Sequence, residues 1–193
     1  MKIFEINSDC DKYEGMVDEA YVKSNYDDDY IQDFDDDMFL SNTPIVKNWI
    51  GVNLLPVADK YKGKKSDFPN FYSSAPLFSL KSKNILLPHL TKLGVFYEFI
   101  VSEKEKYYCF KVTNLLDGFL NHQNSIFKRF SSSNRIMSIE KFIFKNELRS
   151  TFIFRIPERK SPIFCNERLK EIIEQHKLKG FVFSEIGEYK IKN

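Results

Sequence analysis

The sequence predicts an α+β fold with a mostly antiparallel sheet and a few packed helices. Short apolar runs with strand periodicity fill the second half of the chain, and the segments between neighbouring runs are short enough for antiparallel hairpins. One amphipathic helical segment lies near the end of the sequence. With 193 residues, 42% of them hydrophobic and 16% aromatic, the chain has the length and composition of one ordinary domain with an extension.

Residues 166–178 are predicted to form the amphipathic helix. Asn166 is a favourable N-cap, because its side chain can accept from a free backbone N–H of the first turn. Gly180 is predicted to take the left-handed conformation that closes the helix.

The apolar stripe of this helix is formed by Leu169, Ile172 and Ile173, at the spacing of one helical face. A lone helix of this length is marginal in water, so the stripe must be buried on the sheet. We expect it to pack against three aromatic residues of the flanking strands, namely Phe152, Phe154 and Phe183.

A second helix is predicted near residues 82–93, with Ser82 as its N-cap and Gly94 as its stop. The sheet is expected to be built from residues 95–156, with a hairpin formed by the first two strands. The candidate strands are residues 2–6, 38–40, 49–52, 95–101, 106–112, 124–130, 136–144, 152–156 and 181–183.

The chain divides into two regions by composition. Residues 1–75 are expected to form an acidic N-terminal region and a basic aromatic loop packed on the main domain, and residues 76–193 the α+β domain. Residues 1–50 carry 13 acidic and 4 basic side chains, a net charge of −9, against +11 for residues 51–193. Such an asymmetry is typical either of a binding surface or of two regions that attract each other.

The acidic charge is densest between residues 27 and 37, where Tyr30 and Phe34 interrupt a run of aspartates: Asp27, Asp28, Asp29, Asp33, Asp35, Asp36 and Asp37. Charge runs of this kind are usually solvated loops. The functional alternative is an acidic surface for a basic partner, with the two aromatic residues as anchors. Calcium binding is disfavoured, because the segment lacks the glycine and terminal glutamate of an EF-hand loop.

Residues 56–76 combine four lysines with interleaved aromatics, a pattern that can bind single-stranded nucleic acid. No motif of a known nucleic-acid-binding module accompanies the pattern, so a surface loop pinned by its aromatics is favoured.

An enzyme is the main functional alternative, as a small hydrolase or transferase with Cys109 or Cys165 as nucleophile and His122 or His176 as base. Cys165 is the better placed thiol, because a helix N-terminus lowers the pKa of a thiol. The sequence contains no HExxH, GxSxG or phosphate-binding glycine loop, so we expect no cofactor and no metal. It also lacks a membrane span and a signal-peptide core, which predicts a cytoplasmic protein with reduced thiols.

Four short motifs follow one another in the second half of the chain: VTNLLD at residues 112–117, the Ser125 that follows, IFRI at 153–156, and LKGF at 178–181. Together they resemble a bacterial immunity-protein family of polymorphic toxin systems, the one numbered eleven and formerly a domain of unknown function. The resemblance covers roughly residues 75–186, and the first 75 residues do not clearly match.

The resemblance implies a cytoplasmic protein without enzymatic activity that binds and neutralises a cognate toxin domain, encoded by the adjacent gene. The acidic segment supplies the candidate toxin-binding residues: Asp27, Asp28, Asp29, Tyr30, Phe34, Asp35, Asp36 and Asp37. The enzyme with a cysteine nucleophile and the nucleic-acid-binding module stay open as alternatives. A membrane partner is not expected.

Overall fold

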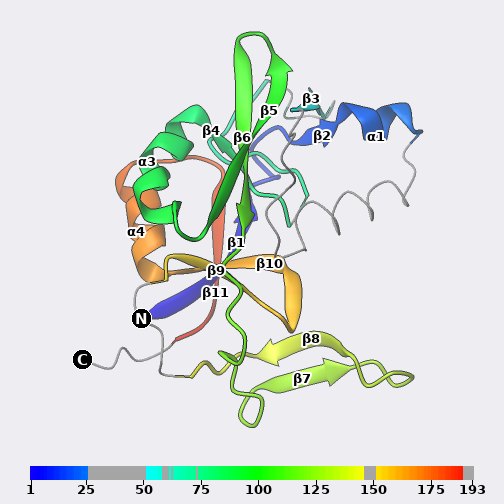
Figure 1. The fold of residues 1–193 in the computed structure, drawn as a ribbon, viewed down its shortest axis with the longest axis vertical. Helices are drawn as coiled ribbons and strands as arrows, with labels where there is room; N and C mark the ends of the chain where they lie inside the picture. The colour runs from blue at the N-terminus through cyan, green and yellow to red at the C-terminus, as the bar shows by residue number, and fades with distance from the viewer. Residues whose placement is uncertain (26–50, 58–60, 62, 73, 146–150, 189–193) are drawn as a thin grey trace.

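A computed structural model describes residues 1–25, 51–57, 61, 63–72, 74–145 and 151–188 of the chain. Three sheets, one short helix and a pair of adjacent helices make up this part (Figure 1). The elements in chain order are β1 (Lys2–Ser8), β2 (Met16–Asp18), α1 (Glu19–Lys23), β3 (Val52–Pro56), β4 (Leu77–Ser79), α3 (Leu80–Leu90), β5 (Gly94–Ser102), β6 (Glu105–Val112), β7 (Ile126–Arg129), β8 (Ile136–Lys141), β9 (Ile153–Ile156), β10 (Arg159–Asn166), α4 (Glu167–Gln175) and β11 (Phe181–Glu188). This is a sheet-rich fold of the predicted α+β class.

The first sheet has five strands in the order β2-β3-β5-β6-β4. Its centre is the predicted hairpin of β5 and β6, which pair antiparallel along nearly their whole length and project from the body of the molecule. The pairing of β3 with β5 is parallel, while the other pairings in this sheet are antiparallel.

The second sheet has four antiparallel strands in the order β11-β1-β10-β9. The N-terminal strand β1 is an inner strand of this sheet, where Phe4 lies opposite both Cys165 of β10 and Glu185 of β11. The first eight residues are thus hydrogen-bonded between segments from the other end of the chain. The boundary at residue 75 between the two predicted regions stays a prediction.

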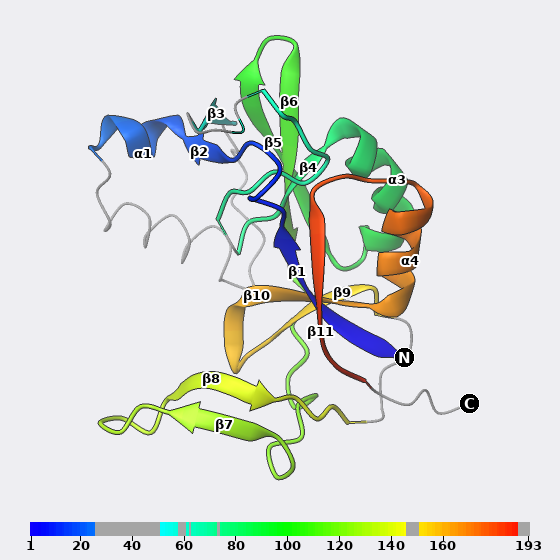
Figure 2. The same cartoon turned by 180° about the vertical axis from the view of Figure 1, so that it is seen from behind.

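Helices α3 and α4 lie side by side (Figures 1 and 2), where α3 contacts β4 and β6 of the first sheet and α4 contacts β1 and β10 of the second. Each begins at a side chain that caps its first turn. Ser79 Oγ accepts from the backbone N–H of Ser82 at 3.1 Å, and Asn166 Oδ1 accepts from that of Leu169 at 3.0 Å. The N-cap of α3 is therefore Ser79 and not the predicted Ser82, because Ser82 is the residue that donates to the cap.

The end of α4 differs from the prediction. Lys177, with φ of 51°, takes the left-handed position immediately after the cap residue His176. The N–H of Leu178 bonds to the carbonyl of Ile173 at 3.1 Å and that of Lys177 to Glu174 at 3.0 Å, which is the Schellman pattern. Gly180 also has a positive φ, 90°, but it serves the entry into β11 and does not close the helix.

The apolar stripe of α4 is buried at Leu169 and Ile173, while Ile172 is only partly buried. Phe152 and Phe183 pack against the same core cluster, as predicted. Phe154 does not, because alternation along β9 turns it to the opposite face of the sheet, and Ile153 faces the helix instead. The sequence prediction was therefore correct for Phe152 and Phe183 and wrong for Phe154.

Strands β7 and β8 form a separate two-stranded sheet, which we call the arm (residues 126–141). It lies below β10 in Figures 1 and 2, and its inner face contributes Phe127, Ile136 and Ile139 to a second core cluster with the far face of the four-stranded sheet. The strands between residues 95 and 156 are consequently divided among three sheets, not gathered in the single sheet that the sequence predicts.

In the described part of the chain, no helix is long and apolar enough to cross a membrane. The expected strand at residues 38–40 lies outside the described residues, as does the first half of the one expected at 49–52.

Candidate functional site

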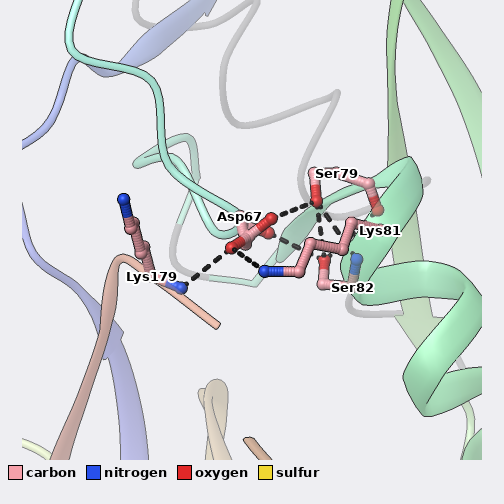
Figure 3. A network of polar contacts seen from close by, with 5 residues as sticks. All are labelled: Asp67, Ser79, Lys81, Ser82 and Lys179. Atoms are coloured by element: carbon pink, nitrogen blue, oxygen red, sulfur yellow. Dashed lines mark hydrogen bonds and ion pairs between the residues drawn. The ribbon is translucent and has the colours of Figure 1, made fainter. Parts of the chain in front are cut away.

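Polar contacts from two separate segments converge on Asp67 (Figure 3). Its carboxylate accepts hydrogen bonds from the Ser79 hydroxyl at 2.7 Å and from the backbone N–H of Lys179 at 2.9 Å. The ammonium of Lys81 lies 3.6 Å from the same carboxylate. The backbone carbonyl of Asp67 accepts from the Ser82 hydroxyl at 2.8 Å. Asp67 thereby joins the start of α3 to the segment that precedes β11.

The same segments also approach each other through their backbones. The N–H of Asp67 donates to the carbonyl of Lys179 at 3.0 Å. A Cβ on the neighbouring Gly180 would lie 2.6 Å from the Cβ of Ser66, so this approach requires glycine. Phe181 then stacks on Phe68 with ring centroids 4.3 Å apart. The LKGF motif is thus a structural junction with residues 66–68.

An open hollow of about 570 Å³ lies beside this junction. Five lysines and three acidic side chains line it, together with Tyr107 and Tyr108. Lys65 is bonded to Glu105 across its wall, and Lys83 lies 3.7 Å above the ring of Tyr108. Burial raises the pKa of Tyr107 to about 12, so this phenol stays neutral at physiological pH. The hollow presents charged side chains without an arrangement of nucleophile and base.

Two of the family-like motifs lie side by side in the structure. Asn114, from VTNLLD, donates from its side-chain amide to the carbonyl of Ile153 at 2.8 Å. The backbone of Arg155, from IFRI, donates to the carbonyl of Asn114 and accepts from the N–H of Leu116, each at 2.9 Å. These hydrogen bonds hold strand β9 in place. They account for the spacing of the two motifs by a structural role that needs no ligand.

Ser125, the third motif, is buried at the base of the arm. Its hydroxyl donates to the carbonyl of Ile143 at 3.3 Å and accepts from the N–H of the same residue at 3.1 Å. This side chain therefore fixes the two ends of the arm to each other.

Two buried cations, Lys111 and Arg155, were not found by sequence reasoning. Lys111 is fully buried and Arg155 is 1% exposed. Burial, followed by the positive charge of Arg155, lowers the pKa of Lys111 to about 8. The one sequence signal for Lys111 was its place inside the aromatic strand YYCFKV. Strand alternation alone would have put this lysine at a half-buried position.

The candidate nucleophiles are not arranged for catalysis. Cys109 and Cys165 are both fully buried. Burial raises the pKa of Cys165, which is the opposite of the predicted effect of the helix N-terminus. His122 is bonded to Glu158, and the backbone of His176 caps the end of α4.

No group of three or more His, Cys, Asp or Glu side chains among the described residues is placed to hold a metal ion. The predicted toxin-binding residues all fall in segment 26–50, outside the described residues: Asp27, Asp28, Asp29, Tyr30, Phe34, Asp35, Asp36 and Asp37.

Comparison with known proteins identifies one family. Residues 98–188 match the model of the Immunity protein family (Imm11), which confirms the resemblance that the sequence motifs carry. The match includes the second half of β5, β6, the arm, α4 and β11, and it begins after Asp67 and β1. No curated protein matches the chain.

Proposed function

We propose, on the premise that residues 98–188 match the Imm11 immunity protein family, that this protein binds a cognate toxin domain and neutralises it by occlusion. The family match is the single observation that carries the proposal. An occluding protein needs a stable surface that fits its target and no catalytic groups of its own. The buried thiols Cys109 and Cys165 are consistent with that requirement.

The proposed partner is a protein toxin encoded by the adjacent gene of a bacterial polymorphic toxin system, and the proposed compartment is the cytoplasm. Immunity by binding must act where the toxin acts, and free cysteines are typical of a reducing compartment.

The acidic segment is proposed to contact the toxin. If the toxin is a nuclease, its substrate groove must be positive to hold phosphate. The aspartates between positions 27 and 37 would then face that groove, with Tyr30 and Phe34 as apolar anchors. Such charge complementarity mainly accelerates association and weakens as salt rises.

The decisive experiment uses the toxin domain that the adjacent gene encodes, produced with an inactivating substitution. It measures the binding of this domain to the full chain. A second assay measures growth of cells that express the active toxin with or without this protein. We expect stable binding and protected growth. Absence of both would remove the immunity assignment.

A charge variant tests the contact through the acidic segment separately from the immunity function. Replacing Asp27, Asp28, Asp29, Asp35, Asp36 and Asp37 by Asn keeps their size and removes their charge. We expect normal folding, slower association with the toxin and weaker protection. A control with three exposed acids replaced elsewhere, Asp11→Asn, Asp117→Asn and Glu171→Gln, should behave as the wild type. An unchanged association rate in the six-residue variant would eliminate the acidic contact and leave the immunity assignment standing.

A further inference from the structure

The arm combines a fixed inner face with an exposed outer face. Phe127, Ile136 and Ile139 pack inward on the second core cluster. On the outside, Ile126 is 50% exposed, Phe130 43% and Met137 44%. Among the described residues, these are three of the nine large hydrophobic side chains that stand exposed, and Phe130 is the aromatic one.

The arm also carries four cations. Lys128, Arg129, Arg135 and Lys141 are all exposed on the arm, against the single acidic residue Glu140. Arg129 extends over the ring of Phe127, with its guanidinium 5.4 Å from the ring centroid. Phenylalanine, methionine and arginine are the residue types enriched where proteins bury surface against partners.

Contacts within the arm favour its ordered conformation in the absence of a partner. At its tip, the guanidinium of Arg129 donates to the carbonyl of Asn134 at 2.8 Å, and the backbone N–H of Phe130 donates to the carbonyl of Arg135 at 2.9 Å. Asn134 closes the turn with φ of 53°. A two-stranded ribbon alone is marginally stable, so these contacts and the packed inner face are what order it.

The base of the arm is fixed as well. Ser125 bonds to Ile143 on the opposite side of the base. His122 contacts the ring of Phe127 at 5.2 Å and is bonded to Glu158, which belongs to the connection between β9 and β10. A surface that is ordered in advance loses little conformational freedom on binding, which favours affinity.

We infer that the outer face of the β7–β8 arm is a docking surface for an acidic, partly apolar face of the cognate toxin domain. This inference rests on the proposed function, which supplies a protein partner, and adds where it binds. The charge of the arm selects the kind of partner surface. Residues 126–141 carry a net charge of +3, so the arm attracts an acidic surface and repels a basic one. The apolar residues supply the contact area and the cations the orientation.

The basic arm would bind an acidic face of the toxin, and the acidic segment would bind a basic face. The two contacts therefore involve different faces of the toxin. Each is tested by its own variants, so loss of one contact leaves the other measurable.

Two arm variants test the inference with the catalytically inactive toxin domain as probe and the full chain as binder. Phe130→Ser with Met137→Ser removes the apolar anchors. Lys128→Gln with Arg135→Gln removes two charges without touching the contacts of Arg129. Matched controls carry the same kinds of change elsewhere: Val95→Ser with Val182→Ser at exposed positions of β5 and β11, and Lys92→Gln with Lys104→Gln at exposed lysines.

We expect the apolar variant to bind at least tenfold more weakly, mainly through faster dissociation. The charge variant should associate several-fold more slowly at low salt, with a smaller salt dependence of the association rate. Both controls should match the wild type, and amide hydrogen exchange in residues 126–141 should slow on binding.

Wild-type constants in both arm variants, with the wild type still binding, would overturn the docking surface and leave the immunity function intact. Equal losses in the controls would overturn it too. Failure of the wild type to bind the toxin removes the proposed function and the docking surface together. The arm variants could instead lose affinity for duplex DNA or for a second copy of the chain while they still bind the toxin as the wild type does. That result would overturn the toxin as the partner of the arm.

Discussion

The carboxylate of Asp67 accepts a 2.9 Å hydrogen bond from the backbone N–H of Lys179, 112 positions further along the chain. Asp67 precedes the segment that matches the immunity family, and Lys179 lies within it. The family-matched segment is therefore fastened to a residue that lies outside the match.

Replacing Asp67 should loosen this junction. Asp67→Ala removes the acceptor for Ser79 and Lys179, and we expect a loss of about 1–3 kcal/mol in the free energy of unfolding. Urea denaturation measures it. Glu171→Ala, an exposed acid on α4, is the control and should change stability little. Equal midpoints for the two variants would contradict the structural role of Asp67.

Gly180→Ala should be more destabilising than Gly118→Ala. Both glycines have positive φ, 90° and 67°, so each alanine meets a left-handed backbone cost of about 1–2 kcal/mol. A Cβ at Gly118 meets nothing within 4 Å, whereas one at Gly180 would lie 2.6 Å from Ser66 Cβ and 3.0 Å from the Phe68 carbonyl oxygen. The difference between their thermal or chemical midpoints measures the close approach, and no difference would mean that the two segments separate easily.

The buried face of α4 predicts unequal costs for two adjacent residues. Ile173 is 2% exposed, and Ile173→Ala should cost about 2–5 kcal/mol. Ile172 is only partly buried, so Ile172→Ala should cost less, roughly 1–2 kcal/mol. Guanidinium denaturation of both variants checks the order. The reverse order would show that the helix presents its other side to the core.

The buried Lys111 predicts a pH dependence of stability. Its folded-state pKa of about 8 lies below the ordinary lysine value of about 10.4, so the unfolded chain binds more protons between these pH values. The Lys111 contribution to the free energy of unfolding therefore rises with pH in this window, by on the order of 1–3 kcal/mol.

Two other groups act in the opposite direction. Burial raises the pKa of Cys165 and of Tyr107, so the unfolded chain loses these protons first and stability falls as pH rises past their ordinary values. Comparing the wild type with Lys111→Met between pH 7.5 and 9.5 cancels both contributions. We expect the difference in stability between the two proteins to change in favour of the wild type as pH rises, and a constant difference would refute the assignment.

Local features of the fold were predictable from sequence where neighbours in the chain determine them. The cap of Asn166 and the β5–β6 hairpin depend on residues a few positions apart, and both are present. The end of α4 was missed because a glycine was expected at the left-handed position, while Lys177 occupies it with the help of the buried Leu178.

The arrangement of the sheets depends on contacts between distant segments, which periodicity does not encode. Nothing in residues 2–8 indicates that β1 separates β10 from β11. The docking arm was likewise predicted only as two strands, because its separation from the main sheet follows from the packing of Phe127 and Ile139 on a second core. The acidic segment remains a prediction.

The inner position of β1 has a consequence for synthesis of the protein. Its neighbours β10 and β11 are made about 160–180 residues later, which is roughly 8–36 s at 5–20 residues per second. During that interval both edges of β1 stay unpaired. The strand is therefore accessible to chaperones and to other nascent chains. The four-stranded sheet closes only when the last strand has emerged, so a shortened or stalled chain lacks this half of the fold.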